Sequence, residues 1–464
     1  MIRFLNAYFP ARTLFLGISE ALLVTLAFMA ATFARLGTDD ASIMLNYEQG
    51  FLKILVVSIV FITCMYYFDL YDSIILSNRR EVVTRLVQVL GTVCILLALL
   101  YYAIPNLQLG RGIFLIGLAI VTLILFAWRR LFLAVNTLPQ FAERALILGD
   151  GPLAQPLIAE IESRPELGMR IAGQLRQPTN GNKDHAVLAE PEQFEQLTRQ
   201  VEAFRADRMI VAMGERRGQL PVEALLRLKS KGLRIQDGAE AYEAITGKVP
   251  IESLRLSWLL FSPGFHVSRP LLIYKRMFSF LISLICLILL SPVMILVAIA
   301  IRLDSAGPAI FKQERVGEGG KIFTLYKFRT MVEGADRDDN HRPAEITDSR
   351  FTRVGRWLRR TRIDEFPQLF NILRGDMYFV GPRPFVPNQE QECLEKIPYY
   401  RQRWVVKPGA TGWAQVNRGY CASLEDNADK LAYDLFYIKN ISVGLDLLIM
   451  FKTIKTLLLS RGSR

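Results

Sequence analysis

Residues 275–302 read KRMFSFLISLICLILLSPVMILVAIAIR, and the apolar run from Met277 to Ile301 is long enough to cross a bilayer core. Basic residues stand at both ends of this run, and Ser291-Pro292 interrupts it in the middle. Positive charge at both ends argues against crossing, and a proline removes a backbone donor and kinks a helix. The pattern therefore predicts a re-entrant helix over 270–302, made of two halves around a break, that enters and leaves the membrane by one face. An ordinary kinked transmembrane helix is the alternative.

Four further apolar segments lie in the first third of the chain, and each approaches the roughly 20 residues that span a bilayer core. They are Leu14–Ala34, Phe51–Phe68, Leu86–Ile104 and Gly112–Trp128. The connector 37–50 carries acids and no Lys or Arg, whereas arginines flank the other connections. By the positive-inside rule, residues 1–135 are predicted to form a four-span transmembrane bundle with both ends in the cytoplasm. Glu20 fits two interpretations equally well, a functional intramembrane acid or an acid that reaches the interface.

The composition restricts the class of protein. The 464 residues are 51% apolar and carry a formal net charge of +12, which suits anionic lipid or a phosphorylated substrate. Nucleic acid is not an expected partner, because basic patches interleaved with aromatic residues and recognisable nucleic-acid modules are missing from the sequence. The five cysteines lie far apart without a CxxC pair, and none of the three histidines stands beside a serine or cysteine nucleophile. A disulfide framework, a zinc site and a hydrolytic triad are therefore not expected, which leaves carboxylates as the catalytic candidates.

Residues 142–255 show short strand-like runs that alternate with helical ones, which predicts a small doubly wound α/β domain. Strands are expected at 144–148, 209–213 and 233–236, and a helix at 154–164. The residues from Gly149 to Ala154 form a GxGxxA pattern between strand and helix, the place where a Rossmann domain binds a pyrophosphate. The acid expected after the second strand is missing, because that region reads GQLR at 173–176. We therefore predict a degenerate Rossmann-like scaffold used for assembly or regulation, with a working dinucleotide site as the alternative.

Residues 362–371 read RIDEFPQLFN, and GPRP follows at 381–384. A carboxylate attacks phosphorus only if cations neutralise the phosphate oxygens, and this stretch supplies two adjacent acids among arginines. On a helix the side chains of Asp364 and Glu365 diverge by about 100°, so divided roles are expected rather than a shared proton. The alternative is that both acids occupy a first helical turn and offset the helix dipole. Arg383 lies between two prolines that fix the backbone, and it is expected to present its guanidinium to a phosphate.

Further motifs stand in order from Lys275 onward. They are KR at 275–276, SP at 291–292, GP at 307–308, QERVG at 313–317, YKFRTM at 326–331, DEFPQL at 364–369, GDM at 375–377, GPRP at 381–384 and KPGATGW at 407–413. With these motifs, the region from Lys275 to Leu459 resembles the bacterial sugar transferase family, the polyprenyl-phosphate glycosyl-1-phosphate transferases with a monotopic membrane anchor. The four spans and the Rossmann-like domain match the larger architecture within this family. The resemblance implies a mainly helical catalytic domain at 303–464.

The resemblance implies transfer of a sugar 1-phosphate from a UDP-sugar to undecaprenyl phosphate with release of UMP. This would be the initiating step of exopolysaccharide or other surface glycan synthesis. Asp364 matches the family's nucleophile, which forms a covalent phosphosugar intermediate, and Glu365 matches the second acid, a metal ligand or proton acceptor. Mg²⁺ is the implied cofactor, with Asp364 and Glu365 as its ligands. The implied location is the bacterial inner membrane with the catalytic domain on the cytoplasmic face, and the implied assembly is a homodimer.

The resemblance also assigns further residues to phosphate or substrate binding, namely Lys327, Arg329, Arg359, Arg383, Asp434 and Asp446. For the two aspartates, helix caps or ion pairs are the alternative, because they stand among apolar residues. Arginines recur at every third position from Arg350 to Arg362, but each step slips by about 60° around a helix, so they form no single stripe. Because Trp357 and other apolar residues lie among them, this helix is expected to lie at the level of anionic lipid headgroups. Solvated surface charge is the alternative.

Two other functions remain open on the sequence alone. Asp336-Arg337-Asp338 is a possible DxD-type ligand pair of a metal-dependent glycosyltransferase, which would release UDP in place of UMP, although it stands in a polar, loop-like stretch. The chain is alternatively a non-catalytic membrane scaffold whose Rossmann-like module senses a nucleotide. Within the resemblance, Arg362 and Tyr378 stand where serine is common, which leaves the sugar open.

Overall fold

The computed structural model describes residues 1–4, 6–72, 79–136, 142–175, 190–214, 220–253, 264–265, 268–334, 350–418 and 423–458. The chain divides into two compact units, one of Met1–Ile2 with Phe9–Ala241 and one of Arg3–Tyr8 with Tyr242–Arg464. Each unit is described by itself. At the amino terminus, β1 (Ile2–Phe4) and β2 (Ala7–Phe9) form a two-stranded sheet.

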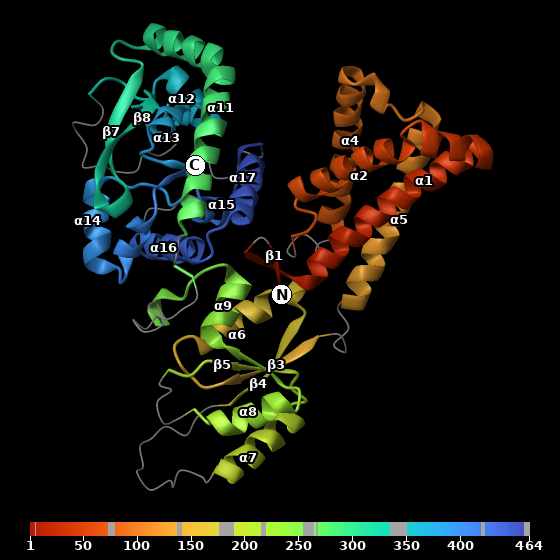
Figure 1. Ribbon diagram of the computed structural model, residues 1–464, viewed down its shortest axis with the longest axis vertical. Coiled ribbons are helices and arrows are strands. Elements are labelled where there is room, and N and C mark those ends of the chain that lie inside the picture. The colour runs from red at the N-terminus through yellow and green to blue at the C-terminus, as the bar shows by residue number, and fades with distance from the viewer. Residues whose placement is uncertain are drawn as a thin grey trace. The chain divides into compact units, whose positions relative to one another are not determined.

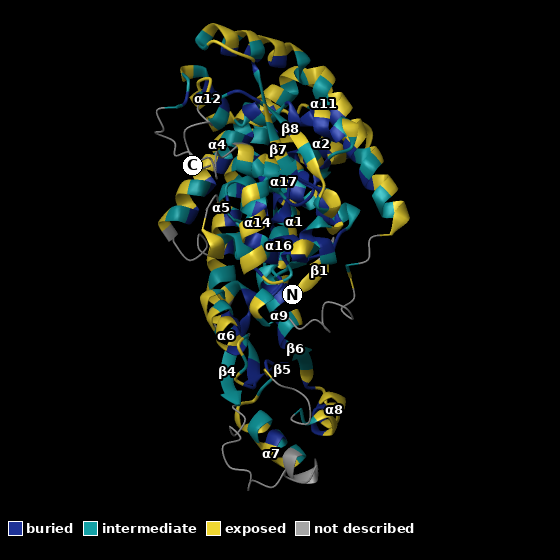
Figure 2. Ribbon diagram, turned by 90° about the vertical axis from the view of Figure 1, so that its left-hand side faces the viewer, coloured by how far each residue is buried: buried dark blue, intermediate teal, exposed yellow. Residues whose placement is uncertain are grey.

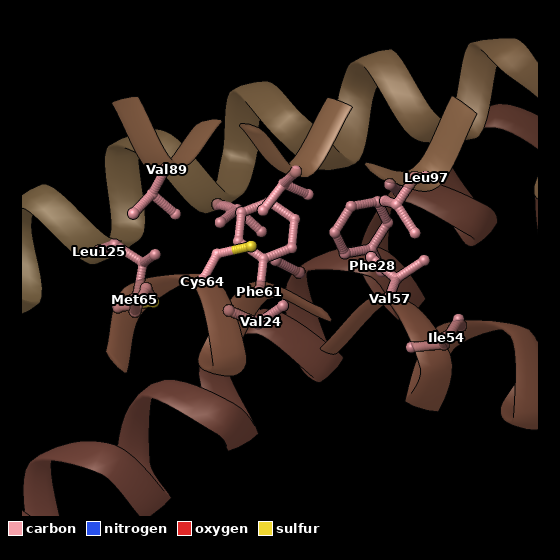
Figure 3. Close-up of a cluster of buried hydrophobic side chains, with 14 of the residues drawn as sticks. Val24, Phe28, Ile54, Val57, Phe61, Cys64, Met65, Val89, Leu97 and Leu125 are labelled. Carbon is pink, nitrogen blue, oxygen red and sulfur yellow. The ribbon is translucent and has the colours of Figure 1, made fainter. Parts of the chain in front are cut away.

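Long apolar helices make up the first part of the chain. They are α1 (Ala11–Tyr47), α2 (Gly50–Tyr67), α4 (Arg79–Ala103) and α5 (Arg111–Asn136), with the short 3₁₀ turn η1 (Pro105–Leu107) before α5. Each of these α-helices is long and apolar enough to cross a membrane. Their inward faces share one core, in which Phe28 of α1 and Phe61 of α2 lie 6.1 Å apart between ring centroids (Figure 3). The predicted apolar segments are therefore helices that pack on one another.

The acid-bearing connector 37–50 differs from a simple loop. Helix α1 continues to Tyr47, and only Gly37 leaves the helical conformation, with φ 79°. A left-handed φ is open to glycine at no steric cost, so the chain kinks there and resumes as a helix. The hydrophobic pattern located the membrane-length run of this helix and missed its polar extension.

Glu20 of α1 has a partner on α5. Its two carboxylate oxygens accept hydrogen bonds from Arg129 Nε at 2.6 Å and Nη2 at 3.0 Å, and both side chains are buried. The remaining Arg129 Nη1 donates to the carbonyl of Leu70 at 3.0 Å. A bidentate pair of this kind satisfies both charges and fixes the register of two helices. Contact with Arg129 therefore accounts for Glu20 without a transport or catalytic role.

The α/β domain contains a four-stranded parallel sheet in the order β4-β3-β5-β6. Its strands are β3 (Glu143–Leu148), β4 (Met169–Leu175), β5 (Arg208–Val211) and β6 (Arg234–Asp237). The helices between them are α6 (Ala154–Ser163), α7 (Glu190–Ala203) and α8 (Val222–Ser230), and the turn η3 (Pro165–Leu167) precedes β4. Helix α6 covers one face of the sheet and α7 and α8 the other (Figure 1). The predicted doubly wound arrangement is confirmed for this part of the chain.

The second unit is mostly helical and begins, after α9 (Gly238–Thr246) and η4 (Ile251–Ser253), with the long helix α11 (Arg269–Asp304). An antiparallel hairpin follows, formed by β7 (Ile310–Val316) and β8 (Ile322–Phe328) around η5 (Glu318–Gly320). The short strands β9 (Tyr378–Val380) and β10 (Gly409–Thr411) pair in parallel. The remaining elements are α12 (Arg353–Thr361), η6 (Ile363–Glu365), α13 (Gln368–Arg374), α14 (Pro387–Lys396), η7 (Tyr400–Val405), α15 (Trp413–Asn417), α16 (Leu424–Lys439) and α17 (Val443–Leu458).

Helix α11 stays helical through Pro292, whereas the sequence predicts a break there. Proline lacks the N–H group that would reach the carbonyl of Ile288 four residues back. The hydroxyl of Ser291 donates to that carbonyl at 2.9 Å, so a side chain supplies the missing hydrogen bond. Figure 1 shows that α11 changes direction along its length. The Ser-Pro pair thus permits a bend without ending the helix.

Both halves of α11 contact the same folded domain. In the first half, Arg276 donates to the carbonyls of Ile372 and Leu373 at the end of α13, at 2.6 and 2.7 Å. In the second half, Met294, Val297 and Ile301 pack with Phe328 and Leu358 in one apolar cluster. Elsewhere along the helix, apolar side chains remain exposed (Figure 2), including Ile288, Leu289, Leu296 and Leu303.

Candidate active site

A sharp turn presents the two adjacent acids. Helix α12 ends at Thr361, and Arg362 adopts a left-handed φ of 59°, which redirects the chain into the 3₁₀ turn η6. Asp364 and Glu365 lie in this turn and not in the α-helix that the sequence suggested. A 3₁₀ helix has about three residues per turn, so adjacent side chains still point in different directions. The geometric reason for divided roles therefore applies to this backbone too, and the roles themselves stay a prediction.

Asn371 connects this turn to the β7–β8 hairpin. It is fully buried on α13, its Oδ1 accepts from the backbone N–H of Tyr326, and its Nδ2 donates to the carbonyl of Thr324 at 2.7 Å. A side-chain amide that satisfies two strand groups fixes α13 against β8. The adjacent position on β8 is Lys327, whose side chain is thereby placed next to the acids.

Glu365 is the centre of the charged cluster. Its Oε1 accepts hydrogen bonds from Arg383 Nη2 at 3.0 Å and from Lys327 Nζ at 3.3 Å. These residues come from η6, the GPRP segment and β8, so the fold brings together three positions that the sequence singled out separately. One carboxylate oxygen between two cations holds both cationic groups at the residue next to Asp364 in the chain.

The pKa values of Asp364 and Glu365 are shifted in opposite directions. Burial raises the pKa of Asp364 to about 6, and this effect exceeds the opposing attraction of Lys327. Burial also raises the pKa of Glu365, but Arg383, Lys327 and Arg362 together outweigh it and hold that pKa well below its usual range. Two neighbouring acids with opposite shifts are typical of a catalytic pair with distinct tasks. Glu365 remains ionised, and its low pKa makes it a weak proton acceptor.

Arg403 is a central residue of this region that the sequence did not single out. Its Nη2 donates to Asp434 Oδ2 at 3.0 Å and to the backbone carbonyl of Arg383 at 2.8 Å, and Nη1 lies 3.5 Å from Glu390 Oε1. The guanidinium is buried over the ring of Phe385. Nothing in the run RQR at 401–403 distinguishes Arg403 from the exposed Arg401, because its partners lie far away in the sequence.

Comparison with known proteins identifies two families, one for the carboxyl-terminal region that carries this site and one for an earlier part of the chain. Residues 271–460 match the family described as bacterial sugar transferase, and residues 66–230 match the family described as CoA-binding domain. A UDP-glucose:undecaprenyl-phosphate glucose-1-phosphate transferase of Caulobacter vibrioides is 42% identical over 186 residues, which are 40% of this chain and 69% of that protein. The chain belongs to the bacterial sugar transferase family.

Two more relatives differ in the sugar that their names give. A UDP-N-acetylgalactosamine-undecaprenyl-phosphate N-acetylgalactosaminephosphotransferase of Aeromonas hydrophila is 42% identical over 223 residues, 48% of this chain and 52% of that protein. An undecaprenyl-phosphate glucose phosphotransferase of Komagataeibacter xylinus is 34% identical over 334 residues, 70% of this chain and 60% of that protein. This bacterial sugar transferase therefore matches about half to three fifths of the length of these two relatives.

Two other arginines assigned through the family resemblance make contacts outside the Glu365 cluster. Arg359, in the last turn of α12, places its guanidinium 4.5 Å from the ring centroid of Phe351 and lowers the pKa of Asp364, against the larger effect of burial. Arg329 donates through Nη2 to the carbonyl and hydroxyl of Ser305, at 2.8 and 2.9 Å, just after the end of α11. Substrate binding by these two arginines stays a prediction.

Asp434 and Asp446 of the sugar transferase domain are engaged in buried ion pairs. Asp434 holds Arg403, and burial raises the pKa of Asp434 to about 6 although Arg403 opposes the shift. Asp446 pairs with Lys275 of α11 and accepts from the hydroxyl of Tyr437 at 2.7 Å. Both acids therefore contact protein cations, and their predicted part in substrate binding would act through those cations.

The glycine turn of the α/β domain is filled by its own backbone. A Cβ atom at Gly151 would lie 2.5 Å from the backbone nitrogen of Gly214, and one at Gly149 would lie 2.7 Å from the side chain of Met213. Gln174 lies in the region where a Rossmann domain carries its ribose-binding acid, and it donates to the Gly149 carbonyl at 2.9 Å. Close packing thus accounts for these glycines without a pyrophosphate. The absence of a working dinucleotide site in this module stays a prediction, and the alternative DxD triplet at 336–338 lies outside the described residues.

Proposed function

We propose that the chain transfers a sugar 1-phosphate from a UDP-sugar to undecaprenyl phosphate and releases UMP, as the initiating step of exopolysaccharide or other surface glycan synthesis. The observation that carries this proposal is a buried carboxylate, Asp364, beside an acid that holds a lysine and an arginine. This arrangement supplies a nucleophile and the cations that a diphosphate requires. The names of the relatives support the same reaction class.

The proposed reaction has two displacements at phosphorus. In the first, a carboxylate oxygen of Asp364 attacks the phosphate next to the sugar, and the bond to the bridging oxygen breaks so that UMP leaves with its electron pair. In the second, a phosphate oxygen of undecaprenyl phosphate attacks the same phosphorus and Asp364 leaves as a carboxylate. A covalent aspartyl phosphosugar lets the soluble donor and the lipid acceptor bind one after the other.

The cations next to Glu365 would bind the donor's phosphates. Arg383 and Lys327 are held by a carboxylate that stays ionised, so both groups are positioned before the substrate arrives. Preorganised cations stabilise the charge that develops on the phosphate oxygens without reorganising during the reaction. Glu365 is therefore assigned to positioning these cations and not to accepting a proton.

Mg²⁺ fits this site together with a substrate. Within the described residues, no three His, Cys, Asp or Glu side chains gather into a complete metal site. Asp364 and Glu365 nevertheless supply two carboxylates, and proteins commonly hold Mg²⁺ by one or two carboxylates plus substrate phosphates. These two acids would be the protein ligands of an ion that neutralises phosphate charge.

The contacts of α11 favour the re-entrant arrangement. A straight helix of 36 residues would be about 54 Å long, more than the thickness of a bilayer core. If α11 crossed the membrane, one domain could not hold both Arg276 near its start and Ile301 near its end. We therefore place both ends of α11 and the whole catalytic domain on one side, the cytoplasmic side that the basic flanks predict. Exposed Trp357 and the exposed arginines of α12, next to α11, support contact with anionic headgroups.

The nucleotide product distinguishes the proposed reaction from the alternatives. With membranes containing the protein, Mg²⁺ and undecaprenyl phosphate, one member of a panel of UDP-sugars is expected to yield UMP and a lipid-linked sugar diphosphate. Release of UDP would identify a glycosyltransferase that transfers the sugar alone, with both phosphates kept on the nucleotide. A chain that turns over no donor but binds a dinucleotide tightly would contradict the enzyme assignment and identify a sensing scaffold.

The pH dependence of donor use is expected to follow Asp364. Burial raises the pKa of Asp364 to about 6, so the nucleophile is protonated below that pH and ionised above it. The value of kcat/KM for the UDP-sugar reports groups of the free enzyme and should be about tenfold lower at pH 5 than at pH 7. Measuring UMP release between pH 5 and 8 tests this expectation. A flat profile, or a rate that falls as the pH rises through 6, would contradict it.

A further inference from the structure

Buried cations hold the backbone at both ends of the segment Val380–Pro384, here called the Arg383 loop. At its start, Lys275 Nζ donates to the carbonyl of Val380 at 3.2 Å. At its far end, Arg403 Nη2 donates to the carbonyl of Arg383 at 2.8 Å. Between them, the N–H of Gly381 donates to the carbonyl of Thr411 at 2.9 Å. The loop that carries the phosphate-facing arginine is therefore fixed by side chains from α11 and η7.

Each of the two cations is paired with a buried acid. Lys275 contacts Asp446, Arg403 contacts Asp434, and none of these side chains is more than 5% exposed. Two buried ion pairs are a poor way to gain stability, because well-packed apolar residues of similar volume are usually as stable or more stable. A cation paired with one acid still has a donor left for a carbonyl, which an apolar residue lacks. The carbonyl contacts are the feature that stability alone does not explain.

We propose that Lys275 and Arg403 are positioning residues, neutralised by Asp446 and Asp434, that clamp the two ends of the Arg383 loop so that its guanidinium stays on Glu365. Because this proposal rests on the function proposed above, the clamp assigns indirect roles in the reaction to both predicted acids. It also makes the membrane helix α11 part of the machinery that orients the phosphate-binding arginine, since Lys275 lies on that helix.

The first test measures the loop itself and needs no enzymatic activity. Lys275→Met and Arg403→Met are expected to raise hydrogen exchange at the loop amides, including that of Gly381, by about tenfold or more. Lys439→Met is the matched control, because Lys439 forms a comparable buried pair in the same unit, with Glu243 at 2.8 Å. Unchanged exchange in both loop variants, or equal loosening in Lys439→Met, would overturn the clamp.

If a single replacement prevents folding, a paired replacement removes both charges at once. Lys275→Met/Asp446→Leu leaves no uncompensated buried charge, and Arg403→Met/Asp434→Leu is combined with Glu390→Gln because Glu390 also lies 3.5 Å from Arg403; both variants are then expected to fold. They lose the lysine and arginine donors all the same, and the Val380 carbonyl then keeps only the Tyr437 hydroxyl at 3.2 Å, so faster exchange of the loop is expected in them too. Native-like exchange in the folded paired variants would overturn the proposal.

The second test is a double-mutant cycle on transfer. Arg403→Met is expected to lower kcat about 100-fold, the size of effect that a misplacement near 1 Å produces. If Arg403 acts through Arg383, the double variant Arg403→Met/Arg383→Ala will be no slower than Arg383→Ala alone. Losses that multiply would instead show a separate structural effect and refute the positioning role. A wild-type chain without transfer activity would refute the proposed function, while the exchange experiment would still decide the clamp.

Discussion

Asp364→Asn is expected to abolish both sugar-phosphate transfer and covalent labelling of the protein. The amide occupies the same space but lacks the negative oxygen that attacks phosphorus, so the rate should fall by about 10⁴-fold or more. The measurement uses a UDP-sugar labelled in the phosphate next to the sugar, incubated with wild type and variant in the presence of Mg²⁺ and without lipid acceptor. The label is expected on a peptide containing residue 364 in the wild type alone.

Asp40→Asn serves as the control, because Asp40 is an exposed acid of α1 and its replacement changes the net charge equally. Subsequent addition of undecaprenyl phosphate should discharge the labelled wild type and form the lipid product. A wild type that transfers only when donor and acceptor are present together, and never carries label, would exclude the covalent route. Full activity of Asp364→Asn would exclude Asp364 as the nucleophile.

Glu365→Gln is expected to lower kcat by about 10² to 10³-fold with little change in the overall fold. The amide cannot hold Lys327 and Arg383 as an ionised carboxylate does, so two partly buried cations lose their common anion. A second effect has a definite sign. The Glu365 charge contributes to raising the pKa of Asp364, so its removal should move the midpoint of the pH–rate profile below about 6.

Glu392→Gln provides the comparison for Glu365→Gln. Glu392 is an exposed acid on α14 that pairs with Lys396 one helical turn away, and exposed pairs of this kind contribute little. Steady-state UMP release across pH 5 to 8 and thermal unfolding should be measured for both variants. Equal rates and equal midpoints for the two variants would contradict a central role for Glu365.

Most of the architecture could be predicted because it depends on local pattern. Long apolar runs predicted α1, α2, α4, α5 and α11, and alternating short runs predicted the parallel sheet near its observed bounds. The bend at Ser291-Pro292 was located correctly but was described as a break, because the hydroxyl that replaces the missing donor depends on a rotamer. The 3₁₀ turn under Asp364 was also missed, since it depends on the left-handed backbone of Arg362.

The acids and cations of the site were predictable as residues, but not as a network. Asp364, Glu365, Lys327 and Arg383 stood out by chemistry and motif, and the fold brings the last three into direct contact. Arg403 was missed, and Asp434 and Asp446 were identified without their partners. The Lys275–Asp446 contact joins residues 171 positions apart, and no spacing rule predicts such a pairing from one sequence. Long-range polar contacts of this kind become visible only in three dimensions.

If Lys275 clamps the Arg383 loop as proposed, its hydrogen bond to the Val380 carbonyl makes the activity of the enzyme depend on the position of the membrane helix α11. In a newly made chain whose α11 has not yet entered lipid, Lys275 would not be held in place. Arg383 would then lack its fixed orientation. The chain would then become active at the same step at which α11 is inserted into the membrane.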